Sequence, residues 1–178
     1  MSDLIEVKGL SVRQPWGFAI SDLGKLVENR SRRTNYRGWV AIHAPLTRDD
    51  GVLMPTPEAD RLHRAAQRDL NPRLYAHGFI LALAELASCH HADECDEDDE
   101  TYDGGASKYC SPWAQPGQWH WQLAQVKATA LIRCTGARGL FPLPLPVKDA
   151  VIGRIPIDQD GNPIPAASPA DCQPNVSG

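Results

Sequence analysis

The residues that decide the fold are 119–132, which read WHWQLAQVKATALI. Up to Leu123 the apolar side chains occupy odd positions, and from Ala124 onward they occupy even positions. Successive side chains of a strand face opposite sides of a sheet, so an uninterrupted strand would turn its apolar residues to the wrong side after Leu123. We therefore predict a bulge or sharp bend near Ala124 and Gln125, of the kind found in the long bent strands of small closed barrels.

The remaining elements are predicted from the spacing of apolar residues and from turn residues. Helical spacing predicts one helix at residues 16–23 and a second that follows Thr56, its N-cap, and ends near Leu70. Apolar runs predict strands at residues 39–44 and 79–87. The predicted fold is α+β and mainly β: a curved β-barrel of five to six strands with two or three helices packed on it.

The length of 178 residues fits one domain, which we place at residues 1–145. This domain includes an acidic loop at about residues 91–118, which we expect to be mobile because it offers few apolar side chains to a core. Residues 146–178 are rich in Pro, and we interpret them as a C-terminal extension that is partly disordered.

Charge is unevenly distributed along the chain. The formal net charge is −4, but residues 93–103 hold eight acidic side chains and no basic one. The rest of the chain therefore carries about +4. Only the part outside the acidic run can attract a polyanion, since the run itself would repel one.

Composition also narrows the cellular setting. The first six residues show neither the basic nor the apolar part of a signal peptide, and no apolar run approaches the roughly 20 residues that span a membrane. The five Cys form an odd, irregularly spaced set, which favours free thiols in a reducing compartment. We expect a cytoplasmic monomer that does not bind membranes.

Zinc-type ligands occur near the acidic run, at Cys89, His90, His91, Cys95 and Cys110. Their types suit zinc, but they lack the C-x-x-C and H-x-x-x-H spacings of known zinc sites. We therefore interpret them as solvated residues at the rim of the loop, and we predict no metal and no cofactor.

The N-terminal part carries the strongest motif. Three segments follow one another: Gln14-Pro15-Trp16, then residues 24–30 reading GKLVENR, then residues 36–44 reading YRGWVAIHA. Together they resemble the ASCH domain family of the PUA-like superfamily, whose signature is G-x-K-x-x-E-x-R, with Q-P-W before it and R-G after it. Lys25, Glu28 and Arg30 match the signature, although its first Gly falls on Leu23. The resemblance covers about residues 9–141.

The resemblance implies a PUA-like barrel whose cleft brings Lys25, Glu28 and Arg30 together with Gln14 and Trp16. Within a regular strand Lys25 would face the side opposite to Glu28 and Arg30, so this convergence requires an irregular turn between them. In such a cleft Lys25 and Arg30 would hold a phosphate, Gln14 would read a base edge and Trp16 would stack on a base. The alternative from the residues alone is a buried Trp16 and a structural ion pair between Glu28 and Arg30.

A basic segment follows the motif, with Arg30, Arg32, Arg33 and Arg37 within eight positions. Clustered Arg side chains are the usual footprint of nucleic-acid binding, although a merely solvated basic loop would look the same. The nearby aromatic side chains favour single strands, because unpaired bases stack on them. Our first hypothesis is a protein that binds RNA or a single-stranded nucleic acid in a basic cleft.

Two other classes of function remain open. Some relatives in the ASCH family are amidohydrolases acting on acetylated cytidine, and ribonuclease activity has been proposed for others. The resemblance therefore implies a small hydrolase as an alternative, with Lys25 and Glu28 as catalytic residues. Glu28 stands where the amidohydrolase pattern has a Thr nucleophile, and a carboxylate is a poor acyl acceptor for that route. The third class is a protein-interaction domain that uses the acidic loop or the Pro-rich extension.

Glu85 is a carboxylate within an otherwise apolar predicted strand. A buried carboxylate needs a partner, for which Lys25 or an Arg of the cleft would serve. The alternative is that Glu85 points to solvent at a sheet edge.

Overall fold

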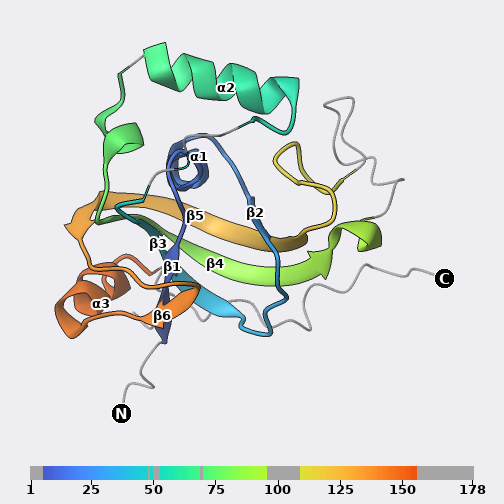
Figure 1. The fold of residues 1–178 in the computed structure, drawn as a ribbon. Helices are drawn as coiled ribbons and strands as arrows, with labels where there is room; N and C mark the ends of the chain where they lie inside the picture. Colours follow the sequence, from blue (N-terminus) through green and yellow to red (C-terminus); the bar gives the residue numbers. More distant parts are fainter. Residues whose placement is uncertain (1–5, 48, 50–52, 69, 96–108, 156–178) are drawn as a thin grey trace, which may run out of the picture.

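The computed structural model describes residues 6–47, 49, 53–68, 70–95 and 109–155. One mixed sheet of six strands forms the centre, with three α-helices around it (Figure 1). The predicted class, α+β and mainly β, is confirmed. The strands are β1 (Val7–Ser11), β2 (Val27–Arg30), β3 (Gly38–Ala44), β4 (Phe79–His91), β5 (Trp119–Arg133) and β6 (Leu140–Pro142).

The sheet has the order β2-β5-β4-β3-β1-β6. Its pairs are antiparallel except β1 with β3, which run parallel. Within the described residues β2 and β6 are the two edges and share no backbone hydrogen bond, so the curved sheet stays open rather than closing into the expected barrel. β4 and β5 form its long curved centre (Figure 1).

The predicted irregularity in β5 is confirmed. Glu85 pairs with Ala124, whereas Leu83 pairs with Lys127, so β5 holds one residue more than β4 across this step. Gln125 takes up the extra residue with a φ of 47°. Its Nε2 donates a hydrogen bond of 2.8 Å to Oε2 of the buried Glu85. The carboxylate is therefore held at the bulge, and it neither faces solvent nor lines the cleft.

Both predicted helices are present. Helix α1 (Trp16–Asp22) packs on β3, β4 and β5, and the chain leaves it through Gly24 at a φ of 71°, which glycine adopts without strain. Helix α2 (Pro57–Arg68) begins after Thr56, whose Oγ1 accepts a hydrogen bond of 3.2 Å from the Ala59 N–H. α2 lies beyond α1 from the sheet (Figure 1).

The C-terminal boundary predicted at residue 145 is wrong. Helix α3 (Leu145–Ile152) follows β6 and buries Val147 and Val151, and the chain beyond it buries Ile155. These side chains belong to the core cluster of Val7 and Trp39, so the packed domain extends to Ile155 at least. The rest of the predicted extension, residues 156–178, lies outside the described residues.

The predicted loop at residues 91–118 is structured in its described parts. A short 3-10 helix, η2 (Ala92–Glu94), follows β4, and Trp113 and Ala114 are each only 3% exposed. The expected mobility falls mainly on residues 96–108, which lie outside the described residues. No helix among the residues that the structure describes is long and apolar enough to cross a membrane.

Candidate functional site

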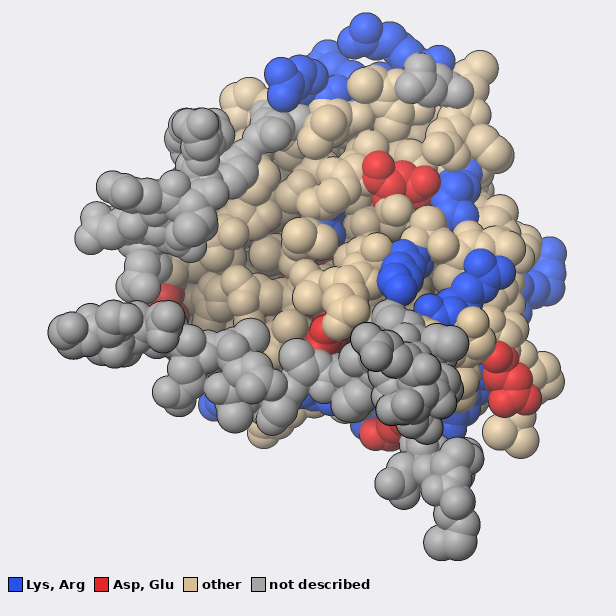
Figure 2. All heavy atoms as spheres, turned by 180° about the vertical axis from the view of Figure 1, so that it is seen from behind, with Lys and Arg blue, Asp and Glu red and all other residues tan. Residues whose placement is uncertain are grey.

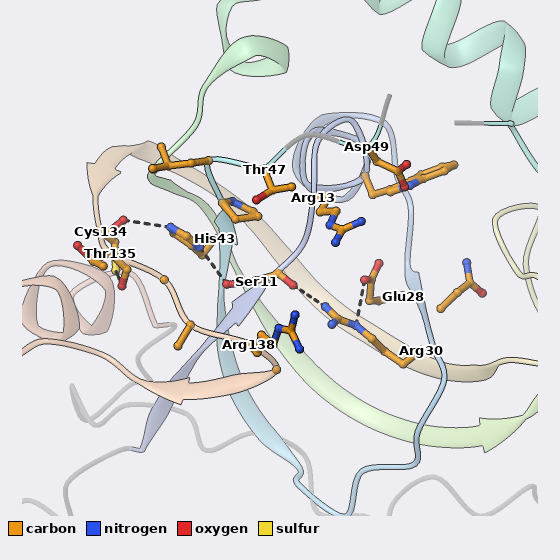
Figure 3. A pocket seen from close by; sticks show the side chains of 18 of the residues that line it. Ser11, Arg13, Glu28, Arg30, His43, Thr47, Asp49, Cys134, Thr135 and Arg138 are labelled. Atoms are coloured by element: carbon orange, nitrogen blue, oxygen red, sulfur yellow. Dashed lines mark hydrogen bonds and ion pairs between the residues drawn. The ribbon is translucent and has the colours of Figure 1, made fainter. Parts of the chain in front are cut away.

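A cavity of about 1020 Å³ opens beside the exit of β1. Most of its lining comes from four parts of the chain: β1 and the residues after it, residues 25–30, the end of β3 with the chain after it, and residues 133–139, which leave β5 (Figure 3). Gly78 and Gln115 also line it. The cavity lies where the curved sheet fails to close. There Arg30 of β2 reaches across the gap, and its Nη2 donates a hydrogen bond of 2.6 Å to the Ser11 carbonyl of β1.

Lys25, Glu28 and Arg30 meet in this cavity, as the resemblance implies. The Lys25 Nζ donates to the Val27 carbonyl and to Glu28 Oε2, the latter over 2.7 Å. Glu28 Oε1 lies 3.1 Å from Arg30 Nε in an ion pair, although Nε has no aligned hydrogen bond. Lys25 is 1% exposed, and burial lowers its pKa, while Glu28 acts in the opposite direction.

The predicted irregular turn makes this convergence possible. The Lys25 N–H donates to the Ala19 carbonyl of α1 over 3.1 Å, and β2 begins only at Val27. Lys25 therefore precedes the strand, so strand alternation does not direct its side chain away from Glu28.

Gln14 and Trp16 of the Q-P-W segment differ in their position relative to the cavity. Trp16 lines the cavity, with its ring centre 5.8 Å from the Lys25 Nζ and its ring edge-to-face with Trp113. Gln14 is 1% exposed and does not line the cavity. Its amide donates to the Arg73 and Ala76 carbonyls and accepts from the Phe18 N–H. The prediction that Gln14 reads a base is therefore corrected, because its hydrogen-bonding groups hold the entry to α1.

Sequence reasoning missed three Arg side chains of the cavity. Arg13, Arg133 and Arg138 are exposed and line it, and none forms an ion pair with a described residue. Figure 3 shows Arg13, Arg30 and Arg138 gathered around one space, with Glu28 between Arg13 and Arg30. Counting Lys25 and Arg30, the described lining residues include five cationic side chains and two carboxylates, Glu28 and Asp49. The cavity is therefore electropositive, and only part of its charge is compensated internally.

A hydrogen-bonded pair, Ser11 and His43, lies on the wall opposite Glu28. Ser11 Oγ is 3.1 Å from His43 Nδ1, and His43 Nε2 is 3.0 Å from the Cys134 carbonyl. That carbonyl can only accept, so Nε2 carries the proton and Nδ1 accepts from Ser11. Burial lowers the pKa of His43, which keeps the ring neutral near pH 7. Gly136 covers the pair so closely that a Cβ there would lie 2.1 Å from His43 Cε1.

The other Arg residues of the basic segment stand apart from the cavity. Arg32 and Arg33 are exposed on the β2–β3 loop, with Arg33 6.0 Å from the Trp119 ring centre. Arg37 donates to the Thr34 and Tyr36 carbonyls of its own loop. None of the three lines the cavity.

Helix α2 carries further basic side chains. Figure 2, which shows the face behind Figure 1, has Lys and Arg gathered along the top, at the height of α2, and along one side. The exposed basic residues of α2 are Arg61, Arg64 and Arg68, of which Arg64 is paired with Asp60.

No family model matches the chain, and no curated protein matches it. The resemblance to the ASCH family therefore stays a prediction.

Proposed function

We propose that this protein binds RNA or another single-stranded nucleic acid in the basic cavity. The observation that carries the proposal is the set of three exposed Arg side chains, Arg13, Arg133 and Arg138, that line one cavity without an ion-pair partner among the described residues. A planar guanidinium offers two parallel donors to a phosphate, and several around one space suit a chain of phosphates.

The cavity divides into a rim and a floor with different tasks. At the rim, Arg13, Arg133 and Arg138 hold phosphates, because these residues are exposed. At the floor, Lys25 and Arg30 are already bound to Glu28, so this trio sets the shape and charge of the site. Trp16 is half-buried at the cavity wall and offers its ring to an unpaired base.

The volume favours a single strand over a duplex. A cavity of about 1020 Å³ can take a nucleotide or two with their bases, whereas a duplex presents its bases stacked and paired. The exposed Arg32 and Arg33 would contact phosphates farther along the strand.

The test is a binding titration with labelled single-stranded RNA, single-stranded DNA and duplex DNA at about 50 mM and 200 mM salt. We expect the single strands to bind more tightly than the duplex. The three rim contacts alone should lower the affinity for a single strand about 20-fold between the two salt concentrations. Equal affinity for all three nucleic acids, or affinity that does not respond to salt, would count against the proposal.

A second candidate, a small hydrolase in the same cavity, is favoured by two observations. Burial lowers the pKa of the Lys25 ammonium, which favours the neutral amine that a general base requires. The Ser11–His43 pair also has the geometry of a nucleophile and its base. It ranks second because Gly136 packs against both side chains and leaves little room for a substrate carbonyl at Ser11.

Turnover distinguishes the two candidates. A hydrolase would release product from RNA or from an acetylated cytidine, and Lys25→Ala or Ser11→Ala would abolish the release while the chain remained folded by circular dichroism. The binding proposal expects no product with any of these substrates at protein concentrations that saturate binding.

A further inference from the structure

Four metal-type ligands from distant parts of the sequence meet at the far end of the β4–β5 pair. His90 lies near the end of β4, His120 lies at the start of β5, Cys95 follows η2, and Cys110 precedes the Trp113 segment. Their ligating atoms all lie within 4.8 Å of one another. Cys95 and Cys110 are free thiols in this arrangement.

The distances within this cluster fit the edges of a tetrahedral site. The His90 Nε2 lies 3.2 Å from the Cys95 sulfur, and the His120 Nδ1 lies 3.3 Å from the Cys95 sulfur and 3.4 Å from the Cys110 sulfur. With zinc–nitrogen bonds of about 2.1 Å and zinc–sulfur bonds of about 2.3 Å, a tetrahedron has nitrogen–sulfur edges of about 3.6 Å. Shifts of a few tenths of an ångström would seat a zinc ion at the centre.

A hydrogen bond outside the cluster orients His120 for this role. Its Nε2 lies 2.9 Å from the Gln115 carbonyl, which can only accept, so Nε2 carries the ring proton. The Nδ1 lone pair is then directed at the two sulfur atoms. Metal-binding His residues commonly donate their second ring N–H to a carbonyl in this way.

Strand alternation explains which residues of the Cys89-His90-His91 run belong to the cluster. His90 and His120 are direct partners across β4 and β5, so their side chains share one face of the sheet. Cys89 and His91 face the other side, where Cys89 packs on the core cluster of Trp121 and His91 stacks edge-on against Trp119.

We propose that His90, Cys95, Cys110 and His120 form a structural zinc site. Two thiolates and two imidazoles in a tetrahedral set are typical of zinc, and four protein ligands leave no open position for catalysis. The prediction of no metal, made from the Cys and His spacing alone, is thereby revised. The spacing analysis also omitted His120, the ligand that the sheet register supplies.

The site would tie the long β4–β5 connection to the strands that it joins. The same connection carries Trp113, which packs against Trp16, and its backbone at Trp113 and Gln115 is hydrogen-bonded to the Asn29 side chain. A zinc ion here would thus hold one wall of the cavity in place. The proposal does not depend on what the cavity binds.

The test is the metal content of the full chain purified under reducing conditions without added chelator. We expect one zinc ion per chain, as measured by inductively coupled plasma mass spectrometry. The double variant Cys95→Ser with Cys110→Ser should lose the zinc, whereas the matched control Cys89→Ser with Cys134→Ser should keep it.

A second measurement on the unaltered sequence covers the case in which the ligand variant does not fold. After zinc removal, titration with Co²⁺ should give the visible absorption of tetrahedral thiolate coordination, saturating at one equivalent and bleached by zinc. The proposal is overturned if the purified chain holds no stoichiometric zinc and Co²⁺ gives no such absorption. Equal metal loss in the Cys89→Ser, Cys134→Ser control, or a Cys95–Cys110 disulfide in the reduced preparation, would overturn it as well.

Discussion

Lys25 shows how one buried charge organises the site. Its ammonium is almost fully buried and reaches a carboxylate and a backbone carbonyl. Removing it would leave Glu28 with Arg30 as its only cationic partner among the described residues. Glu28 is itself 7% exposed. The trio links the end of α1 to β2 and, through Arg30, to β1, so the same residues that line the cavity floor also hold the open edge of the sheet together.

Lys25 gives stability a pH dependence of known sign. Burial lowers its pKa in the folded chain from 10.5, so between the lowered value and 10.5 the unfolded chain binds more protons than the folded one. The free energy of unfolding contributed by Lys25 therefore rises with pH across this window. We expect the free energy of unfolding of the wild type minus that of Lys25→Met to rise toward pH 10.5, by at most about 1.4 kcal/mol per pH unit.

Urea unfolding of both proteins at a series of pH values below 10.5 measures this difference. A difference that falls with rising pH would mean that Glu28 outweighs burial in setting the Lys25 pKa.

Gly136 is required by a close approach rather than by its φ. A Cβ at this position would lie 2.1 Å from His43 Cε1 and 2.9 Å from Ser11 Oγ. We expect Gly136→Ala to lower the free energy of unfolding by about 1–3 kcal/mol, because residues 134–139 must then move off β1 and β3. Thermal unfolding checks this against Gly153→Ala, whose nearest contact would be 3.9 Å away. Equal midpoints for the two variants would contradict the predicted clash.

The sequence motif predicted the cavity floor but not its rim. Lys25, Glu28 and Arg30 lie within six positions, so a local turn suffices to bring them together. Arg133 and Arg138 lie more than a hundred positions later, and they reach the cavity because residues 134–139 pack on His43. That contact depends on tertiary packing and leaves no local pattern in the sequence.

Among the elements, α3 changes the extent of the domain most. Its Val151 is fully buried in the cluster of Trp39 and Phe141, whereas Leu145 at its start is 72% exposed. We expect Val151→Ala to lower the free energy of unfolding by about 1–3 kcal/mol and Leu145→Ala to leave it nearly unchanged. Urea unfolding of both variants measures this. If Val151→Ala were as mild as Leu145→Ala, α3 would not belong to the domain core.

Elements with a regular spacing of apolar residues could be predicted from the sequence, whereas α3, which begins in a Pro-rich stretch, was not predicted. The change of phase after Leu123 predicted the bulge at Gln125, because only a bulge keeps the apolar residues on one side. Residues 146–178 were interpreted as a C-terminal extension because they are rich in Pro. In fact Pro144 precedes α3 and Pro146 lies in its first turn, where the missing N–H has no helical partner to lose. The four-residue spacing of Val147 and Val151 was the helical signal.

The β2–β3 loop carries its own prediction. Arg32 and Arg33 are exposed and outside the cavity, so the double variant Arg32→Glu with Arg33→Glu should weaken single-strand binding without unfolding the chain. Anisotropy titrations at low salt measure the affinity, and circular dichroism checks the fold. Unchanged affinity would remove this loop from the binding surface.

At the scale of the whole chain, opposite charges occupy separate regions of the sequence. The acidic side chains concentrate at residues 93–103, whereas Arg13, Arg133 and Arg138 lie around the cavity at the open edge of the sheet. The proposed zinc ligands His90 and His120 lie on either side of the acidic run in the sequence, at the base of the β4–β5 connection. The open edge supplies the cavity, and the charges around it supply the attraction for a polyanion.

The salt dependence of single-strand binding tests the central claim most directly, when wild type is compared with two matched double variants. Arg133→Ala with Arg138→Ala removes two rim charges, and Lys127→Ala with Arg154→Ala removes two exposed charges outside the cavity. Each phosphate contact on a single strand contributes about −0.7 to the slope of log affinity against log salt, so the loss of two rim contacts should make the slope of the rim variant about 1.4 less steep than that of wild type, whereas the control should keep the wild-type slope. Equal slopes for the rim variant and the control would contradict binding in the cavity.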